Sequence, residues 1–372
     1  MKILIVGAGL SGATLAASLS PDNDVTVIEE KPYIGGMCKD EIEEGEDYCF
    51  HKHCHGPHIF HTDNERVIQF ISMYEDWIPY NHRVKTTAKG CVYSMPINLH
   101  TINQLFHTTY SPMAAKFHIE QVREYFNPDN NLEGFILKNL GTEIYKTFFE
   151  GYTKKQWNVH PSNLPEDIIK RLPIRYTYDD NYFKHDFVAL PKHGYTKFIE
   201  NLLKGSKVIL NCKFDKEIIE KYDYVFYTGC IDEFYDNIYG KLSYRTCHFE
   251  ESEIMDIDDG LGCPVMNFAD IEVPYTRKAD YYYLTPKSVV KGSKTRVVTE
   301  YSSECGEDDL PFYPIFDTKN KEMMEKYREL ALNEKKVAFV GRLANYQYMD
   351  MDSVIDAALN AVSKFRQNCK NG

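Results

Sequence analysis

Residues 1–29 constrain the fold more than any other part of the sequence. An apolar run, "KILIV" (2–6), leads directly into the glycine-rich "GAGLSG" (7–12), the helix-like "ATLAASL" (13–19) and a second apolar run, "VTVIE" (25–29). An unbroken apolar run is typical of a strand buried on both faces of a parallel sheet. The segment therefore predicts a strand–helix–strand unit with a dinucleotide-binding turn after its first strand.

The glycines of that turn have the context that a dinucleotide site needs. Gly7, Gly9 and Gly12 form the pattern G-x-G-x-x-G, and Glu29 lies at the end of the next strand. Glycines let the backbone approach a pyrophosphate that the helix N-terminus stabilises, and the acid accepts hydrogen bonds from ribose hydroxyls. We expect a bound dinucleotide; the alternative is a glycine turn that binds nothing.

Segments from the far end of the chain are expected to join the same sheet. "DYVFYTG" (223–229) and "KVAFVG" (336–341) read as strands, and "DSVIDAALNAVSKF" (352–365) has apolar residues at helical spacing on one face. A second glycine pair, "IGG" (34–36), follows Glu29 closely. Two ends of a chain folded around one ligand suit a long cofactor, so these features favour FAD over NAD.

Composition excludes several classes of protein. The net charge of −12 argues against a nucleic-acid surface, and no apolar run is long enough to span a membrane. The ten cysteines are scattered without C-x-x-C spacing, which is typical of reduced thiols. The chain starts in a strand, with an apolar stretch too short for a signal peptide. We therefore expect a cytoplasmic protein.

The stretch "HKHCHGPHIFH" (51–61) is dense in histidine. His51, His53 and His55 alternate at period two, which on a strand would place them on one face. Imidazoles and a thiolate can bind zinc, so a metal site is one interpretation. No second group of ligands with matching spacing appears elsewhere, so we expect no metal, and the sequence indicates no function for these three histidines or Cys54.

Seven stretches occur in an order that is known from one enzyme family. They are "GPHIFHT" (56–62), "GYTKKQW" (151–157), "IIKRLPIRYTYDDNYF" (168–183), "HGYTKFIE" (193–200), "VPYTR" (273–277), "FYP" (312–314) and "GRLANYQYMDM" (341–351). With these motifs the chain resembles the prokaryotic UDP-galactopyranose mutases over nearly its whole length. Two stretches depart from the usual pattern, "CHGPH" (54–58) and "RKADYYYL" (277–284), and they leave the sugar open.

The resemblance implies an α/β fold: a Rossmann-like FAD-binding domain with an inserted helical bundle and a twisted antiparallel sheet. The FAD-binding domain would comprise residues 1–62, about 200–230 and 325–372, and the helical domain about 63–165. The sheet domain would comprise about 166–199 and 231–324, with a mobile loop over 165–182 that closes over substrate. A homodimer is common in the family.

The resemblance also implies the reaction. The enzyme would interconvert UDP-galactopyranose and UDP-galactofuranose for cell-surface glycan biosynthesis, with FAD active only when reduced. N5 of the reduced flavin would attack the anomeric carbon and expel UDP, which is covalent catalysis by the cofactor. A reductant such as NAD(P)H would be required, although the reaction has no net redox change.

Family roles are carried over to matching positions of this sequence. Catalytic roles fall to Arg171 and Arg277, which would bind the pyrophosphate, and to His58 against the flavin. Substrate contacts fall to Asn81, Tyr152, Thr153, Trp157, Tyr182, Asn267, Tyr313 and Tyr348. Cofactor contacts fall to Gly7, Gly9, Ser11, Gly12, Glu29, Glu30, Gly36, Met37, His58, Ile59, Phe214, Arg342, Asp350 and Met351.

Other functions remain open at this point. A mutase for another nucleotide sugar, such as UDP-N-acetylgalactosamine, would use the same residues. A flavin amine oxidase shares the fold but needs an apolar amine pocket, where this chain has arginines and tyrosines. A binding protein of the GDP-dissociation-inhibitor type would not use flavin, and a colourless purified protein would favour it.

Overall fold

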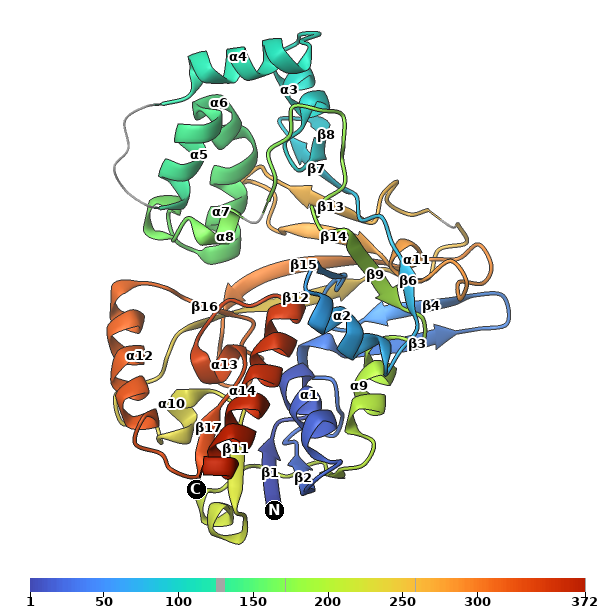
Figure 1. Cartoon of the computed structure of the whole chain (residues 1–372). Helices are drawn as coiled ribbons and strands as arrows, with labels where there is room; N and C mark the ends of the chain where they lie inside the picture. The colour runs from blue at the N-terminus through green and yellow to red at the C-terminus, as the bar shows by residue number, and fades with distance from the viewer. Residues whose placement is uncertain (125–130, 171, 258, 372) are drawn as a thin grey trace.

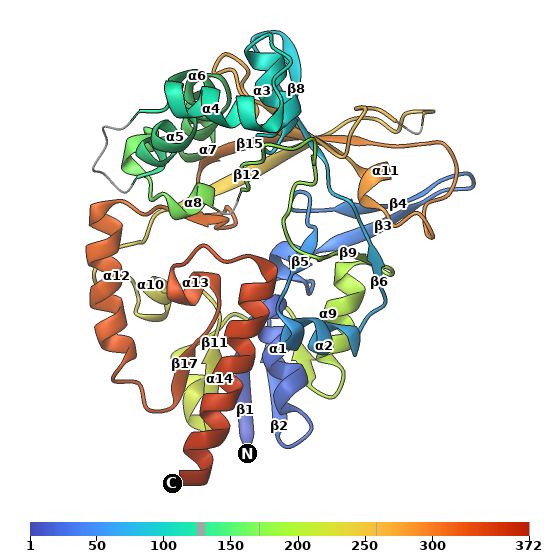
Figure 2. The same cartoon turned by 45° about the horizontal axis from the view of Figure 1, so that its top comes forward.

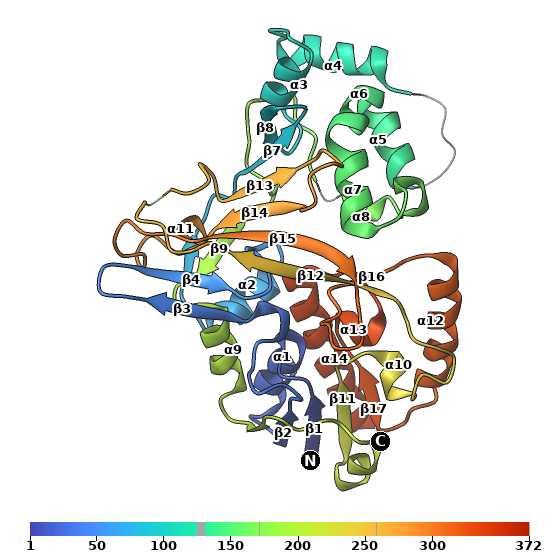
Figure 3. The ribbon, with the colours of Figure 1, turned by 180° about the vertical axis from the view of Figure 1, so that it is seen from behind.

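The computed structural model describes residues 1–124, 131–170, 172–257 and 259–371, which fold into three regions. Both ends of the chain lie in the region built on a parallel sheet (Figure 1). A group of helices forms the opposite region, and a long sheet runs between the two. The view from behind shows the same order of layers (Figure 3).

The parallel sheet has five strands and takes them from both halves of the chain. Its order is β10 (Lys207–Ile209), β2 (Asp24–Ile28), β1 (Lys2–Val6), β11 (Tyr224–Tyr227) and β17 (Val337–Phe339). All neighbouring pairs are parallel. The expectation that strands from distant segments share one sheet is confirmed.

Helices cover both faces of this sheet. Ile3 and Ile5 of β1 pack with α1 (Leu10–Leu19), α9 (Tyr195–Leu203) and α14 (Met351–Asn371) on one face. Leu4 and Val6 point to the other face, toward α10 (Ile231–Phe234) and α12 (Thr318–Ala331). Alternate residues of a strand face opposite sides of a sheet, so an unbroken apolar run fits this double coverage.

The second sheet has seven strands and lies between the parallel sheet and the helical group. Its order is β16 (Tyr313–Pro314), β12 (Tyr244–Glu251), β15 (Val297–Glu304), β14 (Arg277–Asp280), β13 (Val265–Phe268), β7 (Val84–Ala88) and β8 (Cys91–Met95). Neighbouring strands are antiparallel except β13 and β7, which are parallel. The expected fold class, a Rossmann-like domain combined with an antiparallel sheet, is confirmed.

The helical group covers the far side of the long sheet (Figure 2). It comprises α3 (Leu99–Leu105), α4 (Pro112–Val122), α5 (Leu132–Leu140), α6 (Thr142–Ile144), a π-helical turn (Tyr145–Phe149), α7 (Glu150–Trp157), a 3₁₀ turn (Pro161–Asn163) and α8 (Asp167–Lys170). The helical interpretation of residues 63–165 does not hold for 84–95, because β7 and β8 belong to the seven-stranded sheet. The exact domain limits remain a prediction.

Smaller elements connect these layers. A hairpin of β3 (Asp40–Glu44) and β4 (Cys49–His53) projects to one side, and a three-stranded sheet joins β5 (Phe60–Thr62), β9 (Phe187–Pro191) and β6 (Trp77–Pro79). The remaining helices and 3₁₀ turns are α2 (Glu65–Ser72), α11 (Tyr281–Leu284), α13 (Arg342–Asn345), Gly36–Cys38 and Lys216–Lys221. Within the described ranges, every helix is too short or too polar to cross a bilayer.

Candidate active site

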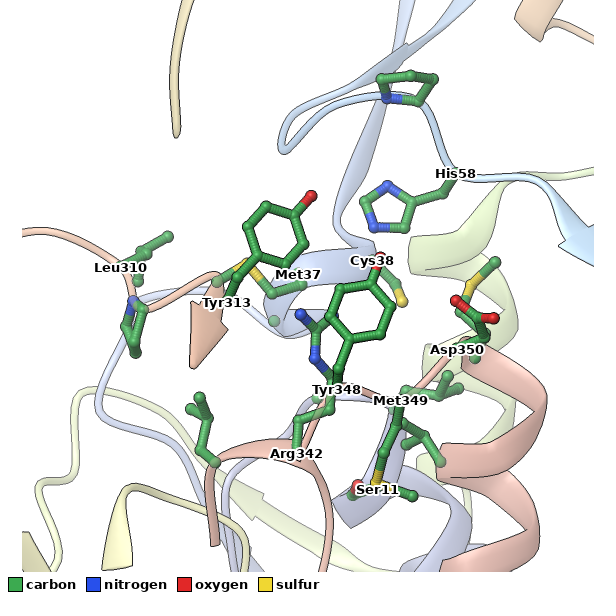
Figure 4. Close-up of a pocket in the computed structure, with 18 of the residues that line it drawn as sticks. Ser11, Met37, Cys38, His58, Leu310, Tyr313, Arg342, Tyr348, Met349 and Asp350 are labelled. Carbon is green, nitrogen blue, oxygen red and sulfur yellow. The ribbon is translucent and has the colours of Figure 1, made fainter. Parts of the chain in front are cut away.

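A cavity of about 750 Å³ runs from the glycine turn of the parallel sheet to the seven-stranded sheet and helix α7. Its lining comes from all three regions of the fold. In the close-up, the side chains of His58, Tyr313, Tyr348 and Arg342 converge on one space, with Ser11 at its lower end (Figure 4). A single cavity therefore joins the dinucleotide turn to the arginine- and tyrosine-rich region.

The glycine turn is packed too closely for other residues. A Cβ at Gly12 would lie 1.9 Å from the carbonyl oxygen of Gly7, and Gly7 itself has a φ of +102°. Glu29 accepts the N–H of Ala8 at 2.8 Å with one oxygen and that of Lys31 at 2.9 Å with the other. These contacts hold the acid of the second strand directly beside the turn.

The N-terminus of α1 opens into the cavity. Among the described residues no side chain caps this helix, whose N-cap is Gly9, so the N–H groups of its first turn remain available. Gly36 approaches Gly9, and a Cβ at Gly36 would lie 3.1 Å from the Gly9 Cα. Gly341 is closer still to Ser11, since its Cβ would lie 2.4 Å from the Ser11 Oγ. This cradle of bare backbone fits a pyrophosphate at a helix N-terminus.

His58 is held in one tautomer. Its Nδ1 lies 2.7 Å from the carbonyl oxygen of Gly56, so Nδ1 carries the proton and donates, and Nε2 has a free lone pair. Its backbone N–H donates to Nδ1 of His53 at 3.0 Å, and the Tyr195 hydroxyl donates to its carbonyl oxygen. Burial, reinforced by His53, lowers the pKa of His58 to about 3. The imidazole is neutral at physiological pH.

Arg277 is half-buried beside the buried Glu300. The two residues are direct partners across β14 and β15, and Nε and one Nη of Arg277 both lie 2.7 Å from the same Glu300 oxygen. Burial opposes the charge, but Glu300, with Tyr152 and Tyr313, raises the pKa of Arg277 above its ordinary value. A guanidinium has five N–H donors, so others remain for an anion in the cavity. Sequence reasoning missed Glu300.

Aromatic rings form one wall of the cavity. Tyr313 and Tyr348 stack at 5.7 Å, Trp157 lies 5.9 Å from Tyr313, and the Arg342 guanidinium lies 5.6 Å from the Tyr313 ring. Burial raises the pKa values of Tyr152 and Tyr313, so both phenols keep their protons and can donate hydrogen bonds. The wall therefore offers flat apolar faces together with polar donors.

Most residues proposed from the sequence line this cavity. They are Gly7, Gly9, Ser11, Glu29, Glu30, Gly36, Met37, His58, Ile59, Tyr152, Thr153, Trp157, Tyr182, Phe214, Asn267, Arg277, Tyr313, Arg342, Tyr348, Asp350 and Met351. Gly12 lies behind the lining, where it packs on Gly7. Arg171 lies outside the described residues, so its placement stays a prediction.

Asn81 is exposed and does not line the cavity, whereas its neighbour His82 does. His82 is 6% exposed, its ring lies 5.4 Å from Tyr182 and stacks on Phe183 at 5.6 Å, and its Nδ1 has no hydrogen-bond partner among the described residues. Burial, with the nearby charge of Arg277, lowers the pKa of His82 to about 3. The neutral imidazole of His82, and not the amide of Asn81, therefore lines this part of the cavity.

His51, His53 and His55 lie outside the cavity lining and pack against other residues. His51 and His53 are buried on β4, and His55 follows the strand with its ring edge against Phe312 at 6.0 Å. Across the described part of the chain, no three His, Cys, Asp or Glu side chains come together as metal ligands. Cys54 has its Sγ 3.6 Å from the Lys39 Nζ.

Comparisons with known proteins agree with this geometry. The model of a family described as UDP-galactopyranose mutase matches residues 147–348, and that of an NAD(P)-binding Rossmann-like domain matches residues 5–74. A probable UDP-galactopyranose mutase of Klebsiella pneumoniae is 43% identical over 100% of this chain and 96% of its own. A dTDP-fucopyranose mutase of Escherichia coli is 42% identical over 99% of both chains. A crystal structure of reduced UDP-galactopyranose mutase shares the fold, with a TM-score of 0.73 over 98% of this chain and 94% of that one at 16% identity.

Proposed function

This chain belongs to the UDP-galactopyranose mutase family, and on that premise we propose that it interconverts UDP-galactopyranose and UDP-galactofuranose on reduced FAD. One observation carries the proposal: the cavity that begins at the glycine turn is also lined by the half-buried cation of Arg277. A dinucleotide and a nucleotide sugar could thus meet in one enclosed space. The glycine cradle, Glu29 and Arg342 support FAD as the dinucleotide.

Reduced FAD, when bound, supplies N5 as the nucleophile toward the anomeric carbon. The protein must then stabilise the departing UDP, whose pyrophosphate gains negative charge as the bond to the sugar breaks. Arg277 provides a permanent cation, and Tyr152, Tyr313 and Tyr348 provide phenol donors on the same lining. Donors aimed at developing charge in a desolvated site are usually the largest contribution to such a step.

His58 has the properties of a hydrogen-bond acceptor beside the reacting atoms. Its Nδ1 proton is committed to Gly56, so only Nε2 can accept a proton from a hydroxyl or a ring N–H. With a pKa of about 3, Nε2 would hold a hydrogen bond without retaining the proton. Such a group can orient a sugar hydroxyl or a flavin N–H, but it is too weakly basic to serve as a general base at neutral pH.

Arg171 is proposed as the second pyrophosphate arginine on the strength of its motif alone. We also propose NAD(P)H as a reductant, a homodimer, a cytoplasmic location and a role in cell-surface glycan biosynthesis, because these follow from the family. All ten cysteines are free thiols, which supports a reducing compartment.

The sugar and the nucleotide are the least constrained part of the proposal. The relatives at 42% and 43% identity are named for dTDP-fucopyranose and UDP-galactopyranose respectively, so identity does not separate them. We place UDP-galactose first and dTDP-fucose second. UDP-N-acetylgalactosamine is a further possibility within the same reaction.

Chromatography of UDP-galactofuranose incubated with the purified protein, with dithionite and without it, tests the proposal. Conversion to UDP-galactopyranose only in the reduced sample is the expected result. The same assay with dTDP-fucofuranose compares the second substrate by kcat/KM. A yellow, reducible protein that converts neither compound would refute the proposed activity.

A further inference from the structure

Lys155 of helix α7 occupies an unusual site beside the cavity. Its ammonium lies within hydrogen-bond distance of four backbone carbonyl oxygens: those of Phe268 at 2.6 Å, Asp270 at 2.9 Å, Val273 at 3.0 Å and Tyr275 at 3.0 Å. These residues belong to one turn, 268–275, which we call the carbonyl turn. An ammonium has three N–H donors, so four carbonyl oxygens are one more acceptor than its hydrogen bonds need.

The carbonyl turn needs a cation to keep this shape. Four carbonyl dipoles that point at one position repel one another unless a positive charge lies between them, as in the carbonyl rings that bind monovalent cations. Burial lowers the pKa of Lys155 to about 8, while Asp270 and Glu272 act in the opposite direction. Lys155 therefore carries its charge at neutral pH.

The helix and the turn also touch directly. Gly151 lies one helical turn before Lys155, and a Cβ at Gly151 would lie 2.4 Å from the carbonyl oxygen of Ala269. The same helix face thus presents a bare backbone and an ammonium to the same turn. The neighbouring Lys154 differs, since it forms an ion pair with Glu150 at 2.7 Å near the surface.

Both partners of this contact carry residues of the candidate active site. Helix α7 contributes Tyr152, Thr153 and Trp157 to the cavity, and Arg277 begins β14 two residues after the carbonyl turn. Phe268 ends β13, one residue after Asn267. The distance between the phenol of Tyr152 and the guanidinium of Arg277 therefore depends on how the helix and the turn are joined.

We propose that Lys155 is a positioning residue: its ammonium occupies a monovalent-cation site in the carbonyl turn and thereby holds Arg277 in register with helix α7 for nucleotide-sugar binding. The substrate-binding part rests on the proposed function, whereas the cation site does not. Lys155 is not one of the residues that line the cavity, so it acts through Arg277 and α7.

Removal of the side chain beyond Cβ should leave a channel that matches n-propylammonium. In Lys155→Ala we expect the KM for UDP-galactofuranose to rise about tenfold or more, with a smaller change in kcat, because ground-state and transition-state binding are weakened together. Millimolar n-propylammonium should restore the KM and raise the melting temperature, while n-propanol, which has no charge, should do neither. Lys154→Ala is the matched control and should stay within about twofold of the wild type.

A second variant separates charge from packing. Lys155→Met keeps the length of the side chain but not its charge or donors, so it should show the raised KM and no rescue by n-propylammonium, because its own stem fills the channel. A wild-type KM and melting temperature in Lys155→Ala, or a folded Lys155→Ala that n-propylammonium does not stabilise, would overturn the cation site. If neither variant folds, Lys155 is a folding residue and the positioning role is refuted.

The melting temperature distinguishes this inference from the proposed function. If the wild-type protein converts no nucleotide sugar, the proposed function fails, yet selective stabilisation of Lys155→Ala by n-propylammonium still supports the cation site. If the wild-type protein is active and the stabilisation is absent, the cation site fails alone.

Discussion

Acid should destabilise this protein through His53, a buried histidine that the fold holds neutral. His53 is 2% exposed, its Nδ1 accepts the N–H of His58 at 3.0 Å, and the ring donates a hydrogen bond to the backbone carbonyl of Leu284. Both ring nitrogens are thus in use, and protonation of Nδ1 would break the bond to His58. Burial, reinforced by His51, lowers the pKa of His53 to about 3 from its ordinary value of 6.5.

The sign and size of the effect follow from proton linkage. Because the folded pKa lies below the unfolded one, the unfolded chain binds more protons between pH 3 and 6.5, and stability falls as the pH drops through 6.5. One such histidine costs about 2 kcal/mol between pH 7 and pH 5, at a slope that approaches about 1.4 kcal/mol per pH unit. His58 and His82 have similar shifts and add to the loss.

Proton uptake on unfolding measures this directly. Protein diluted into urea at pH 5 in a weakly buffered indicator solution should take up close to one proton fewer in His53→Asn than in the wild type, since asparagine can still accept the His58 N–H but does not titrate. His100→Asn is the control, because His100 is exposed in the folded protein and meets solvent in both states. Equal uptake by His53→Asn and the wild type would refute the reasoning.

Three further variants probe the cavity. Arg277→Ala should lower kcat/KM by about 10²–10³ while the protein stays yellow. Arg328→Ala, on the surface, should leave kcat/KM unchanged. Wild-type activity in Arg277→Ala would refute the role of Arg277 in pyrophosphate binding. His82→Phe keeps the stacked ring but loses both nitrogens, so the Kd of UDP-galactose should rise about tenfold while that of UDP is unchanged; equal weakening of both ligands would contradict a sugar contact. Gly12→Ala should abolish flavin absorbance in the purified protein, because its methyl group would lie 1.9 Å from the Gly7 oxygen. Retained flavin would show that the turn can shift to accommodate the methyl group.

The parts of the fold with local signals were predictable from the sequence. The glycine turn follows a strand and opens a helix within a few residues, and the last helix has a regular apolar face that buries Ile355, Ala358 and Val362. Strand β7, "VKTTA", also alternates between buried and half-buried residues, but two threonines weaken the apolar contrast. One of its two partners, β8, follows at once, but the other, β13, lies far along the chain, so no local signal indicates that the pair joins the long sheet.

Contacts between distant segments gave no such signal. Glu300 meets Arg277 only because β14 and β15 pair in one particular register. The sequence predicts that Asn81 contacts substrate, but its neighbour His82 lines the cavity instead. Both residues lie between β6 and β7, and successive side chains of an extended segment point to opposite sides. The carbonyl turn around Lys155 is made of backbone atoms, so its residue types do not reveal it.

The parallel sheet joins the first and last strands of the chain, and this has a consequence for synthesis on the ribosome. Ser11 and Arg342, which both line the cavity, are separated by about 330 positions. At translation rates of about 5–20 residues per second, the second side of the cradle emerges roughly 15–70 s after the first. Until β17 and α14 appear, the nascent chain contains the whole glycine motif but only half of the cradle. We therefore expect capture of the cofactor to follow translation, and a chain that stops before residue 336 should emerge colourless.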